Sequence, residues 1–123
     1  MSGSVKFFER FRIDGYITIT VDVQSYGYMG GYSWCVTEEY LSQKICELQS
    51  LIDNGVEWRF EETDSDDYLE IKRDFSEVFK GKEVYRVNGQ VGGSFNAQYL
   101  VFEYFAERKS IEGYIENLKN LLN

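Results

Sequence analysis

Histidine and proline are absent from this sequence of 123 residues, and cysteine occurs only twice. Without histidine, Ser-His-Asp and Cys-His catalysis are excluded, as are most zinc sites. Two cysteines are too few for a disulfide framework or a four-ligand metal site. We therefore expect Cys35 and Cys46 to be reduced thiols buried among their apolar neighbours.

Long apolar runs are also absent. No stretch approaches the roughly 18 residues that a membrane-spanning helix needs, and residues 1–10 lack the pattern of a secretion signal. A chain of this length fits one domain, residues 1–123. We therefore expect a cytoplasmic protein that makes no contact with a membrane.

Basic residues are scarce beside acidic ones, 13 against 21, so the net charge is −8. This balance argues against nucleic acid as a partner, because phosphates require Lys and Arg. The charge is concentrated in residues 57–77, which hold nine acidic and three basic residues. We call this segment the acidic block and expect it to face a basic protein partner, although a solvated turn is the plainer interpretation. Its candidate contact residues are Glu61, Glu62, Asp64, Asp66 and Asp67.

The acidic block is not a complete calcium loop. Asp64 and Asp66 fit the first two ligand positions, but Leu69 stands where the loop needs Gly and Phe75 where it needs Glu. The glycine-rich segments 27–31 and 89–93 lack the spacing of phosphate or dinucleotide loops. We predict no metal ion, no cofactor and no enzymatic activity. A small enzyme or ligand-binding domain, with two carboxylates in a deep pocket, is the third alternative.

Aromatic residues are abundant, and Tyr26, Tyr28 and Tyr32 lie around the first glycine-rich segment. Tyrosine is common in recognition surfaces because it gives a large contact area at low entropic cost. The alternative is that these rings close the core of the sheet. Stacking on nucleobases is disfavoured because no basic residue lies between Arg12 and Lys44.

The pattern of apolar residues predicts three strands, a helix, four strands and a final helix. Residues 16–23 alternate strictly between apolar and polar, as a half-buried strand does. Thr37 and Gly55 are suited to begin and end a helix over about 38–53, and Ser110 can cap the last helix. The other expected strands cover residues 5–13, 33–36, 56–61, 68–73, 84–91 and 98–105.

Most strand connections are short, which favours antiparallel pairing. The predicted fold class is therefore α+β, a single domain with one curved, mostly antiparallel sheet of about six to seven strands and two helices on one face. Gly89 within the strand 84–91 suggests a bulge or bend. Residues 83–91 are also a candidate exposed edge to which a partner could add a strand.

Two sequence runs resemble the opening of the WapI-type immunity proteins of bacterial contact-dependent and polymorphic toxin systems. They are Tyr16-Ile-Thr-Ile-Thr-Val-Asp-Val and Gly30-Gly31-Tyr32-Ser33-Trp34. The segments 85–91 and 100–104, followed by an amphipathic terminal helix, are similar too. The resemblance implies a cytoplasmic antidote to a toxin domain, which in such systems is often a nuclease with a basic active-site cleft. It implies no catalytic residue.

The leading hypothesis is an immunity protein that binds a cognate toxin domain and occludes its active-site cleft. The alternative is an anti-defence protein of a phage or mobile element that mimics the charge of nucleic acid. The sequence leaves open the partner, the oligomeric state, and whether the acidic block or the tyrosine-rich segment 26–34 is the interface.

Overall fold

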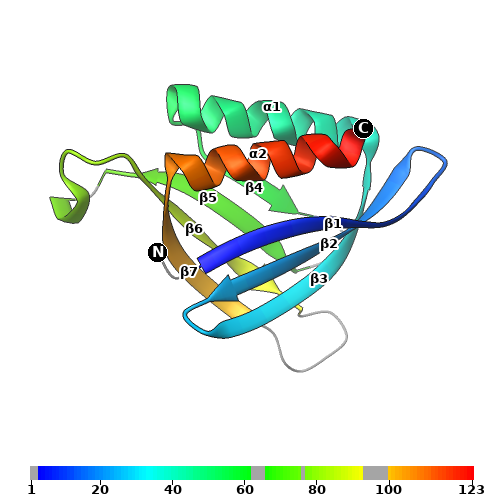
Figure 1. The fold of residues 1–123 in the computed structure, drawn as a ribbon, viewed down its shortest axis with the longest axis horizontal. Helices are drawn as coiled ribbons and strands as arrows, with labels where there is room; N and C mark the ends of the chain where they lie inside the picture. Colours follow the sequence, from blue (N-terminus) through cyan, green and yellow to red (C-terminus); the bar gives the residue numbers. More distant parts are fainter. Residues whose placement is uncertain (1–2, 62–65, 76, 93–99) are drawn as a thin grey trace.

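The computed structural model describes residues 3–61, 66–75, 77–92 and 100–123. The described elements follow the order that the sequence predicts, and the α+β class is confirmed (Figure 1). In chain order they are β1 (Gly3–Ile13), β2 (Tyr16–Ser25), β3 (Tyr28–Thr37), α1 (Glu38–Asn54), β4 (Trp58–Glu61), β5 (Tyr68–Asp74), the 3₁₀ turn η1 (Glu77–Phe79), β6 (Val84–Val91), β7 (Leu100–Glu107) and α2 (Arg108–Leu122).

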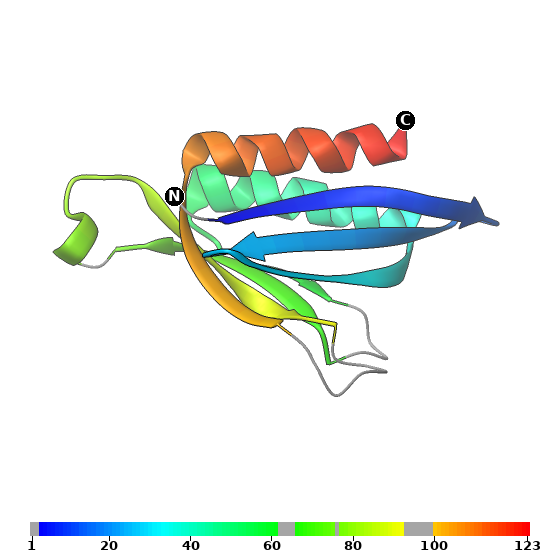
Figure 2. The ribbon, with the colours of Figure 1, turned by 60° about the horizontal axis from the view of Figure 1, so that its bottom comes forward.

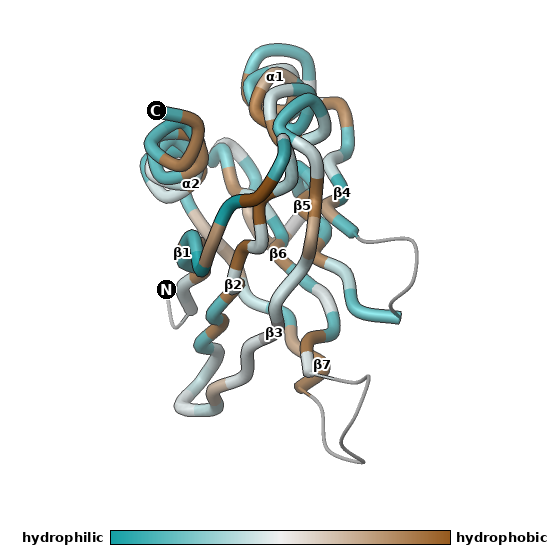
Figure 3. The backbone as a smooth tube through the Cα atoms, turned by 90° about the vertical axis from the view of Figure 1, so that its right-hand side faces the viewer, coloured by the Kyte–Doolittle hydropathy of each residue, from teal (hydrophilic) through white to brown (hydrophobic). Residues whose placement is uncertain are grey.

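The strands form two antiparallel sheets rather than one continuous sheet. The first has the order β1-β2-β3 and the second the order β4-β5-β6-β7. Figure 3 shows them as two arms, with both helices together on one side of the sheets. Where β3 passes the second sheet, the two meet by packing: a Cβ atom on Gly30 would lie 2.8 Å from Cβ of Leu100 and 3.0 Å from Cγ2 of Val91. The helices therefore cover the side that the two sheets leave open.

Local signals place α1 where the sequence predicts it. The Thr37 hydroxyl accepts a hydrogen bond from the Tyr40 N–H at 3.0 Å, and Gly55 ends the helix with φ of 71°. The helix N-cap and a left-handed C-terminal glycine satisfy otherwise unpaired backbone groups. The start of α2 differs from the prediction, because the helix begins at Arg108, two residues before Ser110, without a side-chain cap.

The core lies between the two sheets and beneath the helices. The alternation predicted for β2 is confirmed, since its four apolar residues from Ile17 to Val23 are buried. Phe60 of β4 is the centre of an aromatic cluster, with ring centroids 5.4 Å from Trp34 and 5.9 Å from Phe7. Aromatic contacts of this kind across the core fix the two sheets against each other.

Two predictions about β6, the free edge and the bulge at Gly89, are wrong. The strand is not a free edge, because it pairs with β5 on one side and β7 on the other. Its pairing is also regular through Gly89, so there is no bulge there. Glycine is needed for a different reason: a Cβ atom at position 89 would collide with the carbonyl oxygen of Tyr68.

The thiols also differ from expectation, since Cys35 on β3 and Cys46 on α1 are both exposed. Side chains alternate between the two faces of a strand, so Cys35 points outward while its apolar neighbours point inward. Cys46 lies on the outer face of the helix, opposite the apolar residues that pack on the core. Within the part of the chain that the structure describes, neither helix has the length and apolar character needed to cross a membrane.

Candidate functional site

The described part of the acidic block lies largely on the outer face of the four-stranded sheet, where its charges compensate one another. Arg59 lies 2.9 Å from Glu61 and 3.3 Å from Glu70. Lys72 lies 3.4 Å from Glu70 and 3.8 Å from Glu57. In the described part of this segment, the charges of Arg59, Glu61, Glu70 and Lys72 therefore form a mixed network of ion pairs.

Arg59 is the organising residue of this network. Its guanidinium group lies 4.1 Å from the centre of the Tyr68 ring, and its hydrogen bond with Glu61 raises the pKa of Arg59. Pairs of this type at an exposed surface contribute little stability each, but they hold the side chains in a fixed pattern. A partner that approached this face would have to replace existing ion pairs.

Asp67 is buried rather than presented to a partner. Its side chain is 1% exposed, and its carboxylate accepts a hydrogen bond from the Gly92 N–H at 2.8 Å. Asp74, at the end of β5, is also buried, and its carboxylate lies 2.9 Å from Nη2 of Arg86. Two carboxylates of the block therefore connect neighbouring strands of the sheet. The expectation that Asp67 contacts a partner does not fit this geometry.

Glu61 and Asp66 are the predicted acidic residues that the structure shows as exposed. Glu61 ends β4, and its backbone is bound by the Tyr40 hydroxyl, which donates to the Glu61 carbonyl at 2.8 Å and accepts from its N–H at 3.1 Å. Burial raises the pKa of Tyr40, so this hydroxyl stays protonated. Glu62 and Asp64 lie outside the described residues.

The predicted tyrosines lie in and after the turn between β2 and β3. Tyr26 and Tyr28 are 60% and 70% exposed, so neither ring closes the core. Tyr32 belongs to β3 and pairs with Val21, but its side chain lies outside the described part of the structure. In Figure 3 the β2–β3 turn and the end of β4 lie on opposite sides of the molecule. The fold therefore does not unite the two predicted contact regions.

Sequence reasoning missed an apolar surface on the outer face of the three-stranded sheet. Phe8, Phe11, Ile13 and Tyr16 are 48%, 51%, 60% and 54% exposed, and we call this group the hairpin patch. Phe8 and Phe11 lie opposite Thr20 and Thr18 on β2, and Ile13 pairs with Tyr16. The four side chains therefore follow one another along the same face. Scattered exposed apolar residues are ordinary, but a contiguous group marks an interaction surface.

A β-bulge creates this patch. The pairing of β1 with β2 shifts between Glu9 and Phe11. Val5 and Phe7 point into the core, and in a regular strand Phe11 and Ile13 would share their face, because side chains alternate with a period of two. The extra residue turns Phe11 and Ile13 outward and Arg12 inward. The adjacent pair Phe7-Phe8 was the signal in the sequence that apolar residues would occupy both faces of this strand.

The surroundings of the hairpin patch are acidic. Residues 13–43 contain four acidic residues and no Lys or Arg. The Glu38 N–H donates to the Gly15 carbonyl at 3.1 Å, which fixes the acidic first turn of α1 beside the tip of the hairpin. Arg12 is already engaged, because its Nε lies 3.1 Å from Glu9 and its Nη1 lies 3.5 Å from Glu38.

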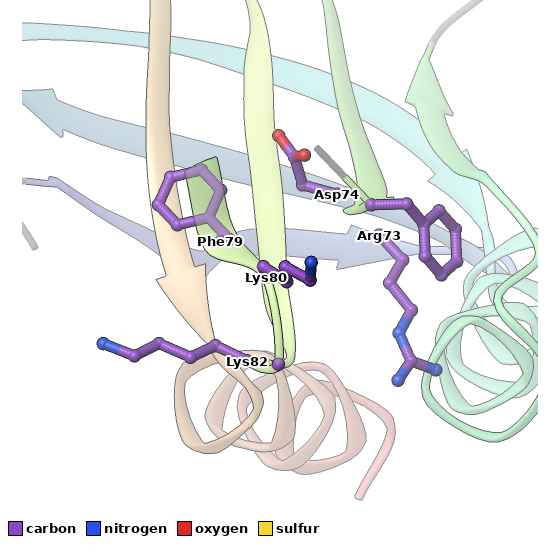
Figure 4. Close-up of a pocket in the computed structure, with 7 residues that line it drawn as sticks. Arg73, Asp74, Phe79, Lys80 and Lys82 are labelled. Atoms are coloured by element: carbon purple, nitrogen blue, oxygen red, sulfur yellow. The ribbon is translucent and has the colours of Figure 1, made fainter. Parts of the chain in front are cut away.

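The hollow shown in Figure 4 lies at the other end of the fold, has a volume of about 210 Å³ and is mainly cationic. Its charged lining residues are Arg73, Lys80, Lys82 and Asp74, and the Asp74 carboxylate is paired with Arg86. Phe79 closes one side by packing on Phe105, with centroids 4.8 Å apart. A single engaged carboxylate among cations does not form the pair of carboxylates that glycosidases use.

A second hollow, of about 440 Å³, contains two carboxylates, Glu83 and Glu107. Glu83 accepts hydrogen bonds from Nε of Arg108 at 2.6 Å and from the Tyr85 hydroxyl at 2.8 Å. The bond from Arg108 is the main reason that the pKa of Glu83 lies below its ordinary value. An acid catalyst needs the opposite shift. In the described ranges, no three potential metal ligands converge on one point.

No protein family model matches the sequence, and no curated protein matches it. The candidate site is therefore defined by geometry alone, as the hairpin patch and the acidic residues beside it.

Proposed function

We propose that this protein acts by binding and inhibiting a basic protein partner. Within that class, we propose an immunity protein that covers the active-site cleft of a toxin domain. The observation that carries the proposal is the contiguous apolar surface of the hairpin patch beside the acidic start of α1. Apolar side chains at the centre of an interface slow dissociation, and charges at its rim speed association.

The distribution of charge favours a protein partner over mimicry of nucleic acid. A mimic must display carboxylates without counterions, in place of phosphates. On the four-stranded sheet, Glu70 instead lies within 3.4 Å of both Arg59 and Lys72, and Glu103 lies 4.0 Å from Arg86. The anti-defence alternative has no comparable support from the described surface.

Rescue of growth is the direct test of this proposal. The genes beside that of this chain are first searched for a toxin domain. The chain is then co-expressed with that domain, and the inactive form of the domain is mixed with the purified chain. We expect cells to survive and a stoichiometric complex to form, with an affinity that falls as salt rises because the rim charges are screened. Failure to rescue growth together with failure to form a complex would contradict the proposal. Inhibition of a restriction nuclease that acts on phage DNA would instead support the anti-defence alternative.

A further inference from the structure

We infer that the outer face of the three-stranded sheet, centred on the hairpin patch, is the surface that docks on the basic partner. This inference rests on the proposed function and names the site through which that function acts. The partner surface that fits has an apolar centre flanked by Lys or Arg side chains. The acidic block on the other sheet is not the docking surface.

The first argument is the cost of the exposed side chains. Phe8, Phe11 and Ile13 are each about half exposed or more on one strand, and apolar area left in water forgoes roughly 25 cal/mol per Å² of burial. The bulge after Glu9 turns Phe11 and Ile13 away from the core. Bulges commonly re-aim side chains next to functional sites, and here the re-aimed residues are apolar.

The second argument is that the surface is open to a partner. Figures 1 and 2 show the β1–β2 hairpin extending past the ends of both helices, with neither helix over the outer face of its sheet. The three strands contain 11, 10 and 10 residues. At about 3.3 Å per residue and 4.8 Å between strands, they cover roughly 450 Å². A standard interface buries about 800 Å² on each partner, so this face supplies about half of that area and the surfaces that adjoin it, including the first turn of α1, contribute the rest.

The third argument is charge complementarity at the rim. Asp14 lies at the tip of the hairpin and Glu38 and Glu39 lie beside it. Asp22 faces outward at the opposite end of β2, where an open hollow of about 350 Å³ adjoins Phe8. Lys6 lies opposite Asp22 and lines the same hollow, so a Lys or Arg side chain of the partner would share the Asp22 carboxylate with Lys6.

The basic residues Lys6, Arg10 and Arg12 are confined to the outer strand β1, where Arg12 already pairs with Glu38. Strands β2 and β3 therefore contribute only acidic charge to this face. The same acidic rim argues against a second copy of this chain as the occupant. Self-association would bring the carboxylates of one copy against those of another, which is unfavourable. A basic partner neutralises them.

The docking mode is contact with the face rather than addition of a strand. The outer edge of β1 is occupied by the side chain of Asn117, which binds both backbone groups of Phe7. At Phe7, a partner strand could not pair without displacing Asn117 of α2. The side chains of the face therefore carry the recognition, and their substitution is a sensitive test.

The test compares two variants in binding to the inactive toxin domain encoded beside the gene. Phe8→Thr combined with Phe11→Thr removes the centre of the patch, and threonine suits a strand. Val101→Thr is the control, because Val101 is an apolar residue on the outer face of the other sheet and, at 64%, is at least as exposed as Phe8 and Phe11. We expect the double variant to raise Kd by about 30-fold or more, as loss of central anchors does, and the control to leave Kd within about twofold. Equal melting temperatures verify that both variants fold.

The outcomes separate the inference from the proposed function. Tight binding by both variants overturns the inference and leaves the proposed function intact. Absence of binding by the unaltered chain contradicts the proposed function and removes the basis of the inference. Light scattering tests whether a second copy of this chain occupies the face instead. If the unaltered chain is dimeric and the double variant is monomeric, the face is a dimer interface. That result also overturns the inference.

Discussion

The side-chain amide of Asn117 forms two hydrogen bonds with the backbone of Phe7, a residue 110 positions away in the sequence. Its Oδ1 accepts from the Phe7 N–H at 2.9 Å, and its Nδ2 donates to the Phe7 carbonyl at 2.9 Å. The amide thus imitates a neighbouring strand at the edge of the sheet. Unpaired edges promote association between chains, and this contact blocks the edge from the side of α2.

Asn117→Ala should destabilise the protein and expose the edge of β1. Loss of two hydrogen bonds at a partly buried site costs about 1–3 kcal/mol in the free energy of unfolding. Urea unfolding measures this cost, and size-exclusion chromatography measures any new self-association. Asn120→Ala, at an exposed position of the same helix, is the control and should change neither. Equal stability of the two variants would show that the Phe7 contact contributes nothing.

Two glycines should respond in opposite directions to substitution by alanine. At Gly89 the added methyl group collides with the backbone of Tyr68 in the neighbouring strand, and overpacking of this kind costs about 1–3 kcal/mol. At Gly113, within α2, no atom outside the helix lies within 4 Å of an added Cβ. Gly113→Ala should therefore raise the free energy of unfolding by about 0.5–1 kcal/mol. Thermal unfolding of both variants checks the difference in sign.

The structure also predicts a dependence of stability on pH at Glu83. The hydrogen bond from Arg108 lowers the pKa of Glu83 in the folded state below its ordinary value of 4.5. A carboxylate with a lowered pKa stabilises the fold above its unfolded pKa, and this contribution is lost as pH falls through the lowered value. Glu83→Gln should therefore be less stable than the unaltered chain at pH 7, and the difference should shrink below about pH 4.5. A difference that stays constant from pH 7 to pH 3 would contradict this assignment.

The features that the sequence predicted well are those determined by nearby residues. The helix α1 is marked at both ends by Thr37 and Gly55, whose conformational preferences act locally. The strand β2 is marked by strict alternation from Tyr16 to Val23, which a half-buried strand requires. Neither prediction depended on the rest of the chain.

The features that the sequence did not predict depend on pairing between distant residues. The role of Asp67 follows from its bond to Gly92, 25 positions away, and Arg59 and Glu70 meet because β4 pairs with β5. The bulge after Glu9 has no glycine to mark it and is visible only from the register with β2. The hairpin patch was missed for this reason, since a regular strand would have buried Phe11 and Ile13.

The two candidate surfaces can be separated by reversing the same amount of charge on each. Asp22→Lys with Glu39→Lys alters the rim of the three-stranded sheet, and Glu61→Lys with Asp66→Lys alters the acidic block. All four residues are exposed, and each pair changes the net charge from −8 to −4. Stopped-flow association with the inactive toxin domain at low salt should be slowed by about tenfold or more by the first pair, because rim charges steer the encounter.

The second pair should slow association less, because its charges lie on the other sheet, farther from the docking surface, and the interaction between two charges weakens with their separation. The salt dependence of the rate should likewise weaken more for the first pair. Equal slowing by both pairs would mean that only the net charge of the chain steers the partner, and stronger slowing by the second would restore the acidic block as the interface. Because the pairs are matched in charge, the comparison isolates position as the cause.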